Sequence, residues 1–365
     1  MGMGNKQHVI VVGAGVVGLL AARELTRAGF SVTVVERGLT GREASRAAAG
    51  ILSTLFPWRS PRPLALLSRW SQSSYAMLAD DVRRASGIDP EWTPSGLLCF
   101  DLGEREAAQA WAQSTGRAID FLEAHEVRRQ EPALADHARP AIFLPGIAHI
   151  HISRFLRALR EAMLNEGVPI KEETGVTGLI EKGGKVTGVR TDAGELHAEH
   201  VVIAAGAWSA GLAETAGITL PVEPVRGQII QFRGPPGLLG RVLCEGDHYL
   251  LARRGGEIIV GSTREHVGFD KGVTNEAREE LTEVAGRLLP VLKGATPARQ
   301  WSGIRPGSPE GVPYIGPHPK LQGLWFNTGH HTNGITLAPG SARLLADLMA
   351  GRAPILDPAP YRPER

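Results

Sequence analysis

The chain has 365 residues, 42% of them hydrophobic and 21% charged, and this ordinary globular composition excludes a disordered, collagen-like or coiled-coil protein. Forty basic and 38 acidic side chains leave a formal charge of +2, too small for an electrostatic grip on nucleic acid or anionic lipid to be the main activity. The 45 glycines are an excess over the usual ~7% of residues, and they mark places where the backbone takes positive φ or is closely approached.

The cysteines and the longest apolar run bear on metal content and compartment. Cys99 and Cys244 lie far apart and in no CxxC pattern, so the sequence predicts neither a disulfide framework nor a zinc or iron–sulfur site. The longest apolar run, Val9–Ala22, has 14 residues with three glycines among them and is too short to span a membrane. We expect a cytoplasmic protein with no metal and no membrane span that acts on small molecules.

A strand, a glycine-rich turn and a helix open the chain. The sequence predicts a buried parallel strand at His8–Val12, a G-x-G-x-x-G turn at Gly13–Gly18 and a helix to about Gly29. A second strand, Ser31–Val35, ends on Glu36. In such a unit the glycines allow a tight turn and the approach of a pyrophosphate, while the acid binds the adenosine ribose and disfavours NADP. The pattern indicates a dinucleotide site; the alternative is a glycine-rich turn in an ordinary α/β sheet.

Residues 42–151 carry weaker signals. Arg42–Ile51 is small and polar, so it either lies flat under a planar ligand or forms an alanine-rich surface helix. His149 and His151 alternate as in a strand, but a metal site would need a third ligand, and two partly exposed histidines are the simpler interpretation. Periodicity predicts a long amphipathic helix over 64–84, a strand over 95–101 and a helix over 104–115.

A helix capped by Ser153 and ending near Gly167 precedes a run of short strands. We expect an antiparallel meander that begins with Val168–Lys171. Its other strands are predicted at Val176–Glu181, Lys185–Thr191 and Glu195–His197. The buried strand Val201–Ala207 then ends in small residues, which suits either a strand that runs back into the nucleotide crevice or an ordinary core turn.

Residues 222–304 change to β character around one helix near Asn275–Leu289. Their strands are predicted at 225–232, 241–243, 249–253, 257–261 and 299–304. This pattern indicates a sheet domain inserted between parts of the nucleotide-binding domain. A Pro/Gly-rich loop to Pro319 and the strand Leu324–Asn327 bring the chain back to that domain.

The cofactor is predicted to be a flavin. The chain has one nucleotide fingerprint, and an enzyme whose single bound dinucleotide must accept and discharge electrons is better served by FAD than by a separate nicotinamide. The segment Gly329–Gly334 opens a final helix, roughly Ile335–Ala350. The positive N-terminal end of that helix would stabilise the negative charge of reduced flavin.

Taken together, these residues resemble the FAD-dependent D-amino-acid oxidase (DAO) superfamily, and within it the glycine oxidases of thiamine biosynthesis. The resemblance runs from about residue 8 to 350. It is carried, in this order, by residues 9–18 with Glu36, 45–50, 201–209, 261–263 with 267–270, 301–307, 313–316 and 329–339.

This resemblance implies an α/β fold in which a Rossmann-like FAD-binding domain, residues 1–85, 145–220 and 300–365, is interleaved with an antiparallel-sheet α+β substrate domain, residues 86–144 and 221–299. It implies a non-covalent FAD, because no cysteine follows Cys244 to match the flavin-linking cysteine of monomeric sarcosine oxidases. The implied cofactor-binding residues are Gly13, Gly15, Val16, Val17, Gly18, Glu36, Arg37, Ala44, Ser45, Ala49, Gly50, Ile51, Val176, Gly206, His330, His331, Thr332, Asn333, Gly334, Ile335 and Thr336.

The substrate residues are also implied by the resemblance. Arg305 matches the family's carboxylate-binding arginine and Tyr249 its substrate-facing tyrosine, and we predict that these two are the catalytic residues. Thr332 and Arg264 are expected beside the substrate but depart from the family, where an arginine often replaces the first and an uncharged side chain the second. We hypothesise that the pocket is wider or less charged near Thr332, which would broaden the range of amines that it accepts.

The implied reaction is oxidative deamination of glycine, sarcosine, D-alanine or D-proline by O2, giving the 2-oxo acid, ammonia and hydrogen peroxide. One alternative keeps the fold and changes the acceptor, as in a D-amino-acid dehydrogenase that feeds a quinone or a cyanide-forming glycine dehydrogenase subunit. Two others are a tRNA-modifying flavoprotein and a flavin-binding protein without turnover. Family members are often tetramers, so the expected partners are an amino acid, O2 and further copies of the chain, with no nucleic acid.

Overall fold

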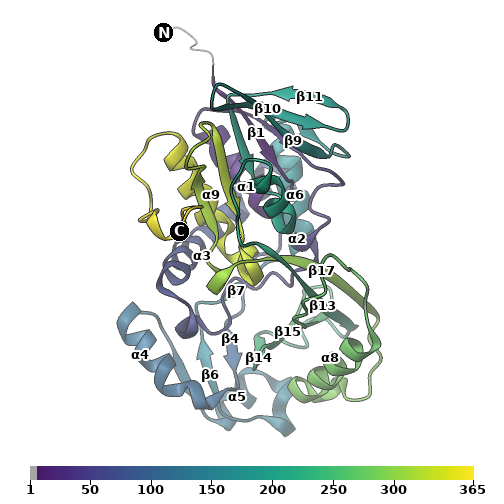
Figure 1. Ribbon diagram of the computed structural model, residues 1–365. Helices are drawn as coiled ribbons and strands as arrows, with labels where there is room; N and C mark the ends of the chain where they lie inside the picture. Colours follow the sequence, from purple (N-terminus) through teal and green to yellow (C-terminus); the bar gives the residue numbers. More distant parts are fainter. Residues whose placement is uncertain (1–5) are drawn as a thin grey trace.

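The computed structural model describes residues 6–365 and contains two large β-sheets, one above the other in Figure 1. The first five residues of the predicted FAD-binding domain lie outside the described residues. The upper, six-stranded sheet holds the nucleotide fingerprint, and the lower, eight-stranded sheet holds the strands predicted for the substrate domain. Within residues 6–365, no helix is long and apolar enough to cross a lipid bilayer.

The six-stranded sheet has the order β18–β19–β12–β1–β2–β8, and every neighbouring pair is parallel except β18–β19. Its strands are β1 (His8–Val12), β2 (Ser31–Val35), β8 (Ile170–Lys171), β12 (His200–Ile203), β18 (Tyr314–Pro317) and β19 (Leu324–Thr328). Because β1, β12 and β19 run in the same direction, the turns that follow them meet at one edge of the sheet. That edge faces the second sheet and positions the site described below.

Layers on both faces bury this sheet. On one face, side chains of β1 and β2 share a core with α1 (Val16–Arg27), α3 (Arg62–Ser86), α6 (Ile152–Asn165) and α9 (Gly334–Met349). On the other face, the alternate residues of β1 pack under a three-stranded antiparallel sheet made of β9 (Val176–Lys182), β10 (Lys185–Thr191) and β11 (Gly194–His197). Burial on both faces explains why β1, β2 and β12 are rich in valine and isoleucine.

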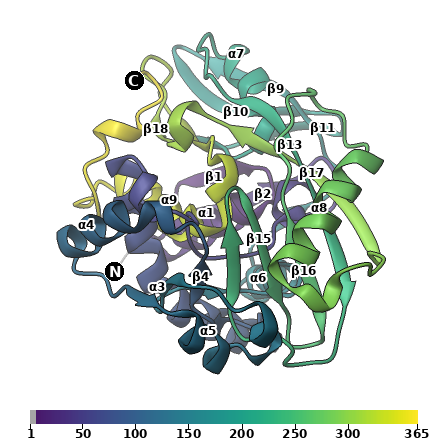
Figure 2. The ribbon, with the colours of Figure 1, turned by 90° about the horizontal axis from the view of Figure 1, so that it is seen from below.

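The eight-stranded sheet has the order β17–β13–β16–β15–β14–β4–β6–β5, and of its pairings β14–β4 is parallel. Its strands are β4 (Leu97–Cys99), β5 (Asp120–Leu122), β6 (Ala141–Leu144), β13 (Glu223–Arg233), β14 (Val242–Glu245), β15 (His248–Ala252), β16 (Glu257–Gly261) and β17 (Arg299–Gly307). Helix α8 (Asn275–Leu288) packs its apolar side chains on β13, β15 and β16, as Figure 2 shows from below. This mixed sheet beside a parallel one confirms the predicted α/β fold.

Shorter elements complete the chain. The remaining helices and strands are α2 (Ala44–Ala47), α4 (Arg105–Thr115), α5 (Ala124–Gln130), α7 (Ser209–Glu214), β3 (Thr93–Pro94) and β7 (Ala148–His149). Single 3-10 turns lie at Pro57–Arg59, Leu102–Glu104, Pro132–His137, Gly206–Trp208, Pro290–Leu292, Pro309–Gly311, His331–Asn333 and Ala359–Tyr361. The turn Gly206–Trp208 and the turn His331–Asn333 follow β12 and β19, so they lie at the edge where the carboxyl ends meet.

Three local predictions were wrong. The segment predicted as the first strand of the meander instead forms β8, which pairs in parallel with β2. Helix α6 precedes β8 and serves as the crossover connection that a parallel pairing requires. The predicted cap Ser153 lies inside α6, whose N-cap is His151 with no side-chain capping bond. His149 is buried rather than partly exposed, because its ring packs beside the buried guanidinium of Arg253.

The predicted domain boundaries stay a prediction, and the pairing of β17 bears on the boundary at residue 300. Strand β17 pairs with β13 along its length, from Arg299 opposite Gln231 to Gly307 opposite Glu223. It therefore belongs to the eight-stranded sheet and crosses the boundary predicted at residue 300. Strand β18 lies in a stretch predicted as a Pro/Gly-rich loop, where Gly316 and Pro317 masked its pairing with β19.

Candidate active site

A cavity of about 390 Å³ lies between the two sheets, at the edge where the turns after β1, β12 and β19 meet. Of the predicted site residues, all but Gly18 and Thr336 line it. Those on its wall are Gly13, Gly15, Val16, Val17, Glu36, Arg37, Ala44, Ser45, Ala49, Gly50, Ile51, Val176, Gly206, Tyr249, Arg264, Arg305, His330, His331, Thr332, Asn333, Gly334 and Ile335. The cavity thus brings together segments from the whole length of the chain.

The glycine-rich turn forms one end of the cavity. Gly13 has φ +109°, and a Cβ there would lie 2.5 Å from the carbonyl oxygen of Ala204. Gly18 does not reach the cavity; its Cα packs against the turn, because a Cβ would lie 1.9 Å from the carbonyl oxygen of Gly13. The N–H of Val16 donates to the Ser45 hydroxyl at 3.0 Å, which ties the start of α1 to the α2 segment. The N-terminal end of α1 therefore opens onto the cavity with its positive dipole end.

Glu36, at the end of β2, has its carboxylate on the cavity wall. One oxygen accepts from the N–H of Ala14 at 2.8 Å and the other from the N–H of Gly38 at 3.0 Å. Each carboxylate oxygen keeps a further acceptor position, so the side chain shapes the turn and can still receive ribose hydroxyls. This arrangement suits the diol of an adenosine ribose and repels a phosphate at the same place.

Sequence reasoning gave no role to Trp208 and Glu43, which also line the cavity near this end. The guanidinium carbon of Arg37 lies 3.5 Å above the centre of the Trp208 ring, and Phe269 stacks on the same indole at 5.1 Å between centroids. Glu43 forms ion pairs with Arg37 at 3.0 Å and with Lys271 at 2.5 Å. The segment after β16 thus reaches across to the nucleotide end, which no local pattern indicates.

The other end of the cavity holds the start of α9. Burial lowers the pKa of His330 to about 3, and burial followed by the charges of Arg305 and Arg264 lowers the pKa of His331 to about 4. Both imidazoles are therefore neutral near pH 7, and the backbone supplies the positive end of this helix. Thr336 lies outside the cavity and donates to the carbonyl of Ile51 at 3.2 Å, which fixes α9 to the opposite wall.

The buried histidine predicts a pH dependence of stability. His330 is 1% exposed, and since its folded pKa of about 3 lies below the unfolded value, its contribution is fully present above pH 6.5 and is lost as the pH falls toward 3. We expect about 2 kcal/mol less unfolding free energy at pH 5 than at pH 7 from this residue. Urea unfolding of the holoenzyme at both pH values measures it. His330→Gln should flatten the dependence, the exposed His125→Gln should not, and equal slopes in all three proteins would refute the assignment.

Arg305 is held on the cavity wall by uncharged groups. Its Nη1 donates to the carbonyls of Thr263 at 3.0 Å and Arg226 at 3.3 Å, and its Nη2 donates to the Ser262 hydroxyl at 2.8 Å. Burial lowers the pKa of this guanidinium, and Tyr249 is the largest influence that raises it. An arginine stays charged under these conditions, so its charge faces the cavity, and no carboxylate of residues 6–365 forms an ion pair with it.

Tyr249 lies beside Arg305 at the same end. Burial raises the pKa of its hydroxyl, so this group is protonated at neutral pH and can donate a hydrogen bond. The hydroxyl lies over Gly261, its register partner on β16, where a Cβ would be 2.6 Å from the tyrosine oxygen. Ser262, next to Gly261, separates the tyrosine from the arginine, so three polar side chains surround one small space.

Glycines on neighbouring strands form the floor of this space. A Cβ on Gly227 of β13 would lie 2.0 Å from Nη2 of Arg305, so the guanidinium lies flat on the backbone at this point. The register partner of Gly227 is Gly303 on β17, where a Cβ would lie 2.4 Å from Cβ of Ala47. Only glycine leaves room there for the arginine and for the α2 segment.

Thr332 and Arg264 lie on the cavity wall, as predicted for residues near the substrate. Arg264 is exposed and has no ion pair or side-chain hydrogen bond within residues 6–365. In the same part of the chain, no group of three or more His, Cys, Asp or Glu side chains could hold a metal ion. The substrate end therefore offers two cations, a tyrosine and hydroxyl groups, which is the chemistry of carboxylate recognition.

The residues fit FAD by the chemistry of their donors. The cavity has a helix N-terminus at each end, from α1 for a pyrophosphate and from α9 for an anionic ring, with the Glu36 carboxylate available to a ribose. Asn327 and His330 are buried residues of the cavity wall. The side-chain amide of Asn327 and Nε2 of His330 have no hydrogen-bond partner within residues 6–365. An extended dinucleotide with a polar, electron-rich ring matches this set.

Comparison with known proteins agrees with the geometry. The chain matches the family described as FAD dependent oxidoreductase (DAO) over residues 8–348. It is 46% identical over 358 residues to the glycine oxidase of Pseudomonas aeruginosa and 43% identical over 359 residues to that of Pseudomonas putida, and each alignment covers 98% of both chains. The crystal structure of glycine oxidase from Geobacillus kaustophilus is similar with a TM-score of 0.92 at 31% identity, covering 99% of both chains.

Proposed function

Because this chain belongs to the DAO family of FAD-dependent oxidoreductases, we propose that it is a glycine oxidase, which deaminates glycine and other small amino acids with molecular oxygen. The products are the 2-oxo acid, ammonia and hydrogen peroxide. The observation that carries the proposal is the charge of Arg305, which lacks a carboxylate in contact and lies beside the Tyr249 hydroxyl on the wall of a cavity that fits FAD.

The donors of Arg305 determine how a substrate binds. A guanidinium has five N–H donors, and three hydrogen bonds to Arg226, Thr263 and Ser262 leave the Nε–H and one Nη2–H free. Two adjacent free donors match the two oxygens of one carboxylate, and the Tyr249 hydroxyl adds a third bond. A carboxylate fixed in this way would hold the amine and the Cα hydrogen in one orientation within the cavity where FAD would bind.

FAD, when bound, accepts the hydride from Cα and passes the electrons to O2. The chain's own part is to bind, orient and exclude water. The raised pKa keeps Tyr249 protonated, so it serves as a donor and not as a base. No other acid or base is assigned, and the amine enters in its neutral form.

The cofactor contacts form part of this proposal. Gly13, Gly15, Val16 and Val17 hold the pyrophosphate, Glu36 and Arg37 the adenosine ribose, and the backbone of Val176 the adenine. Ala44, Ser45, Ala49, Gly50 and Ile51 would lie along the pyrophosphate and ring, and residues 330–335 would cap the pyrimidine side. FAD is non-covalent, because Cys99 and Cys244 are buried in β4 and β14 and neither lines the cavity. We place the enzyme in the cytoplasm as a homo-oligomer, a tetramer by family resemblance.

One experiment tests the function and the electron acceptor. The holoenzyme is mixed without oxygen with glycine, sarcosine, D-alanine and D-proline while the flavin absorbance is followed, and air is then admitted. We expect bleaching by these substrates, then recovery of the spectrum with about one H2O2 for each amine oxidised. Bleaching that air does not reverse would favour the dehydrogenase, and no bleaching by any of the four would refute the proposed function. Turnover of glycine alone would refute the broad acceptance inferred from Thr332.

A further inference from the structure

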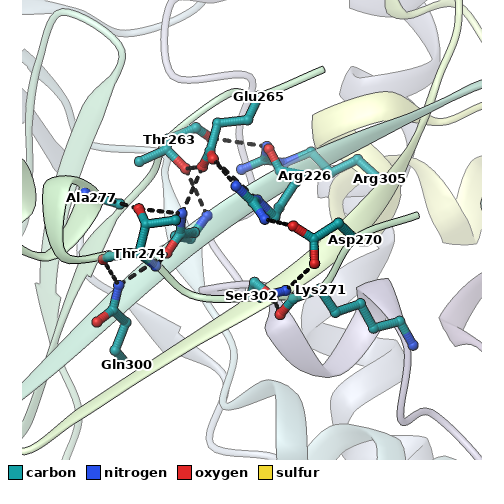
Figure 3. A network of polar contacts seen from close by, with 12 residues as sticks. Arg226, Thr263, Glu265, Asp270, Lys271, Thr274, Ala277, Gln300, Ser302 and Arg305 are labelled. Atoms are coloured by element: carbon teal, nitrogen blue, oxygen red, sulfur yellow. Dashed lines mark hydrogen bonds and ion pairs between the residues drawn. The ribbon is translucent and has the colours of Figure 1, made fainter. Parts of the chain in front are cut away.

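A network of polar side chains surrounds the backbone groups that hold Arg305, and Glu265 is at its centre (Figure 3). One oxygen of the Glu265 carboxylate accepts from the Thr263 hydroxyl at 2.5 Å and from the Gln228 amide at 2.9 Å. The other accepts from Nε of Arg226 at 3.1 Å and from its Nη2 at 2.5 Å. A single carboxylate therefore holds three side chains, two from strand β13 and one from the loop after β16.

The same carboxylate fixes the two backbone carbonyls that hold Arg305. Those carbonyls belong to Thr263 and Arg226, whose side chains both bond to Glu265. Two backbone hydrogen bonds of 2.9 and 3.0 Å also join Arg226 to Glu265 directly. The Thr263 hydroxyl in turn accepts from the N–H of Gln228 at 2.9 Å. Any loosening of Glu265 therefore reaches both acceptors of Nη1.

Glu265 also neutralises a second arginine close to the site. Arg226 is 4% exposed, and its guanidinium is paired with Glu265 on one side and with the exposed Asp270 on the other at 2.5 Å. A buried cation without its carboxylate is strongly unfavourable and would compete for any anion nearby. With Arg226 satisfied, the cations left for a substrate carboxylate at this wall are Arg305, which is partly buried, and Arg264, which is exposed.

We propose that Glu265 is a positioning residue for substrate recognition: by holding Thr263 and Arg226 it sets the plane of the Arg305 guanidinium and so the affinity for the substrate carboxylate. This inference rests on the proposed function, in which Arg305 binds that carboxylate. Glu265 does not line the cavity, whereas Thr263 and Arg305 do, so its effect on the substrate passes through the residues that it positions. Glu265, two residues after the Gly261-Ser262-Thr263 motif, thereby has a role in substrate binding.

The test compares wild-type holoenzyme with Glu265→Ala, using acetate as a carboxylate probe and its perturbation of the flavin absorbance as the signal. We expect the Kd for acetate and the KM for glycine to rise about tenfold, while kcat and the affinity for FAD change less than about threefold. Glu279→Ala removes an equal charge from an exposed position on α8 and is the matched control. Equal acetate affinity in wild type and Glu265→Ala would overturn the inference, as would an equal loss of FAD affinity.

Variants of Thr263 keep the test decisive if Glu265→Ala does not fold. Thr263→Val has the same shape without the hydroxyl that Glu265 holds, so we expect it to weaken acetate binding about fivefold, and Thr263→Ser should restore most of that affinity. Equal affinities of the two variants would refute the role of the hydroxyl. Wild-type enzyme that neither binds acetate nor is reduced by glycine would refute the proposed function instead. Normal wild-type behaviour with unaffected variants would refute only the positioning role.

Discussion

Replacement of Arg305 by alanine is expected to lower kcat/KM for glycine by about a thousandfold, because removing one partner of a desolvated, doubly hydrogen-bonded ion pair costs ~4 kcal/mol. The loss should appear mainly in KM, since the carboxylate loses its binding partner while the hydride still leaves the same carbon. The flavin spectrum should stay intact, because the nucleotide end of the cavity is built from α1, β2 and the α2 segment. Steady-state kinetics and the absorbance spectrum of the purified variant measure both effects.

Two controls sharpen this experiment. Arg305→Lys keeps the charge but presents one point donor in place of two parallel ones, so its loss should fall between wild type and Arg305→Ala. Arg299→Ala removes an exposed cation from the same strand, β17, and should leave the kinetics as in wild type. An Arg305→Ala variant with unchanged KM would contradict the proposed role of this arginine.

The nucleotide-binding half could be predicted because its signals are local. The strand His8–Val12 is predicted with its observed bounds, and the turn Gly13–Gly18 and the acid Glu36 follow from spacing alone. Such a unit is specified within some thirty residues, so neighbouring positions suffice. The final helix was also expected within about one residue of its observed start at Gly334.

The substrate end could not be predicted in the same way, because its contacts join residues far apart in the chain. Arg305 bonds to Ser262 and to the carbonyl of Arg226, at separations of 43 and 79 residues. The resemblance pointed to Arg305 and Tyr249, but nothing in the sequence shows that Ser262 lies between them. Likewise β8 was assigned to the wrong sheet. A strand of two residues is too short to carry a pattern of its own, and its pairing with β2 depends on the helical connection that precedes it.

The glycine excess was interpreted in part only. Glycines were expected where the backbone takes positive φ and where a pyrophosphate approaches it, and Gly183 and Gly184 do lie in the turn between β9 and β10 with positive φ. A third use was missed: Gly227 and Gly261 lie inside strands, have no positive φ, and leave room for the side chains of Arg305 and Tyr249. Glycine inside a strand indicates close approach, but which side chain approaches depends on the pairing of β13, β15, β16 and β17.

Substitution of Gly227 by alanine tests whether the glycine floor is needed to keep the Arg305 guanidinium in place. The new Cβ would lie 2.0 Å from Nη2 of Arg305. Gly227 is paired with Gly303 of β17, and its neighbour Arg226 is bridged to Glu265 on the other side, so the backbone has little freedom to move away. The guanidinium is the mobile end of a long side chain and must swing aside. We expect KM for glycine to rise about a hundredfold, with an unchanged flavin spectrum and a loss of unfolding free energy of less than about 1 kcal/mol.

A double-mutant cycle then separates displacement of Arg305 from general damage to the strand. If Gly227→Ala acts by moving Arg305, it should cost little more once Arg305 is already alanine, and the coupling between the two changes should approach the whole effect of Gly227→Ala. Gly103→Ala is the matched control, because Gly103 is exposed, lacks a positive φ and has no atom within 4 Å of the added Cβ. Additive losses in the cycle would mean that Gly227→Ala distorts the sheet itself, and the glycine floor would then have no specific role in carboxylate binding.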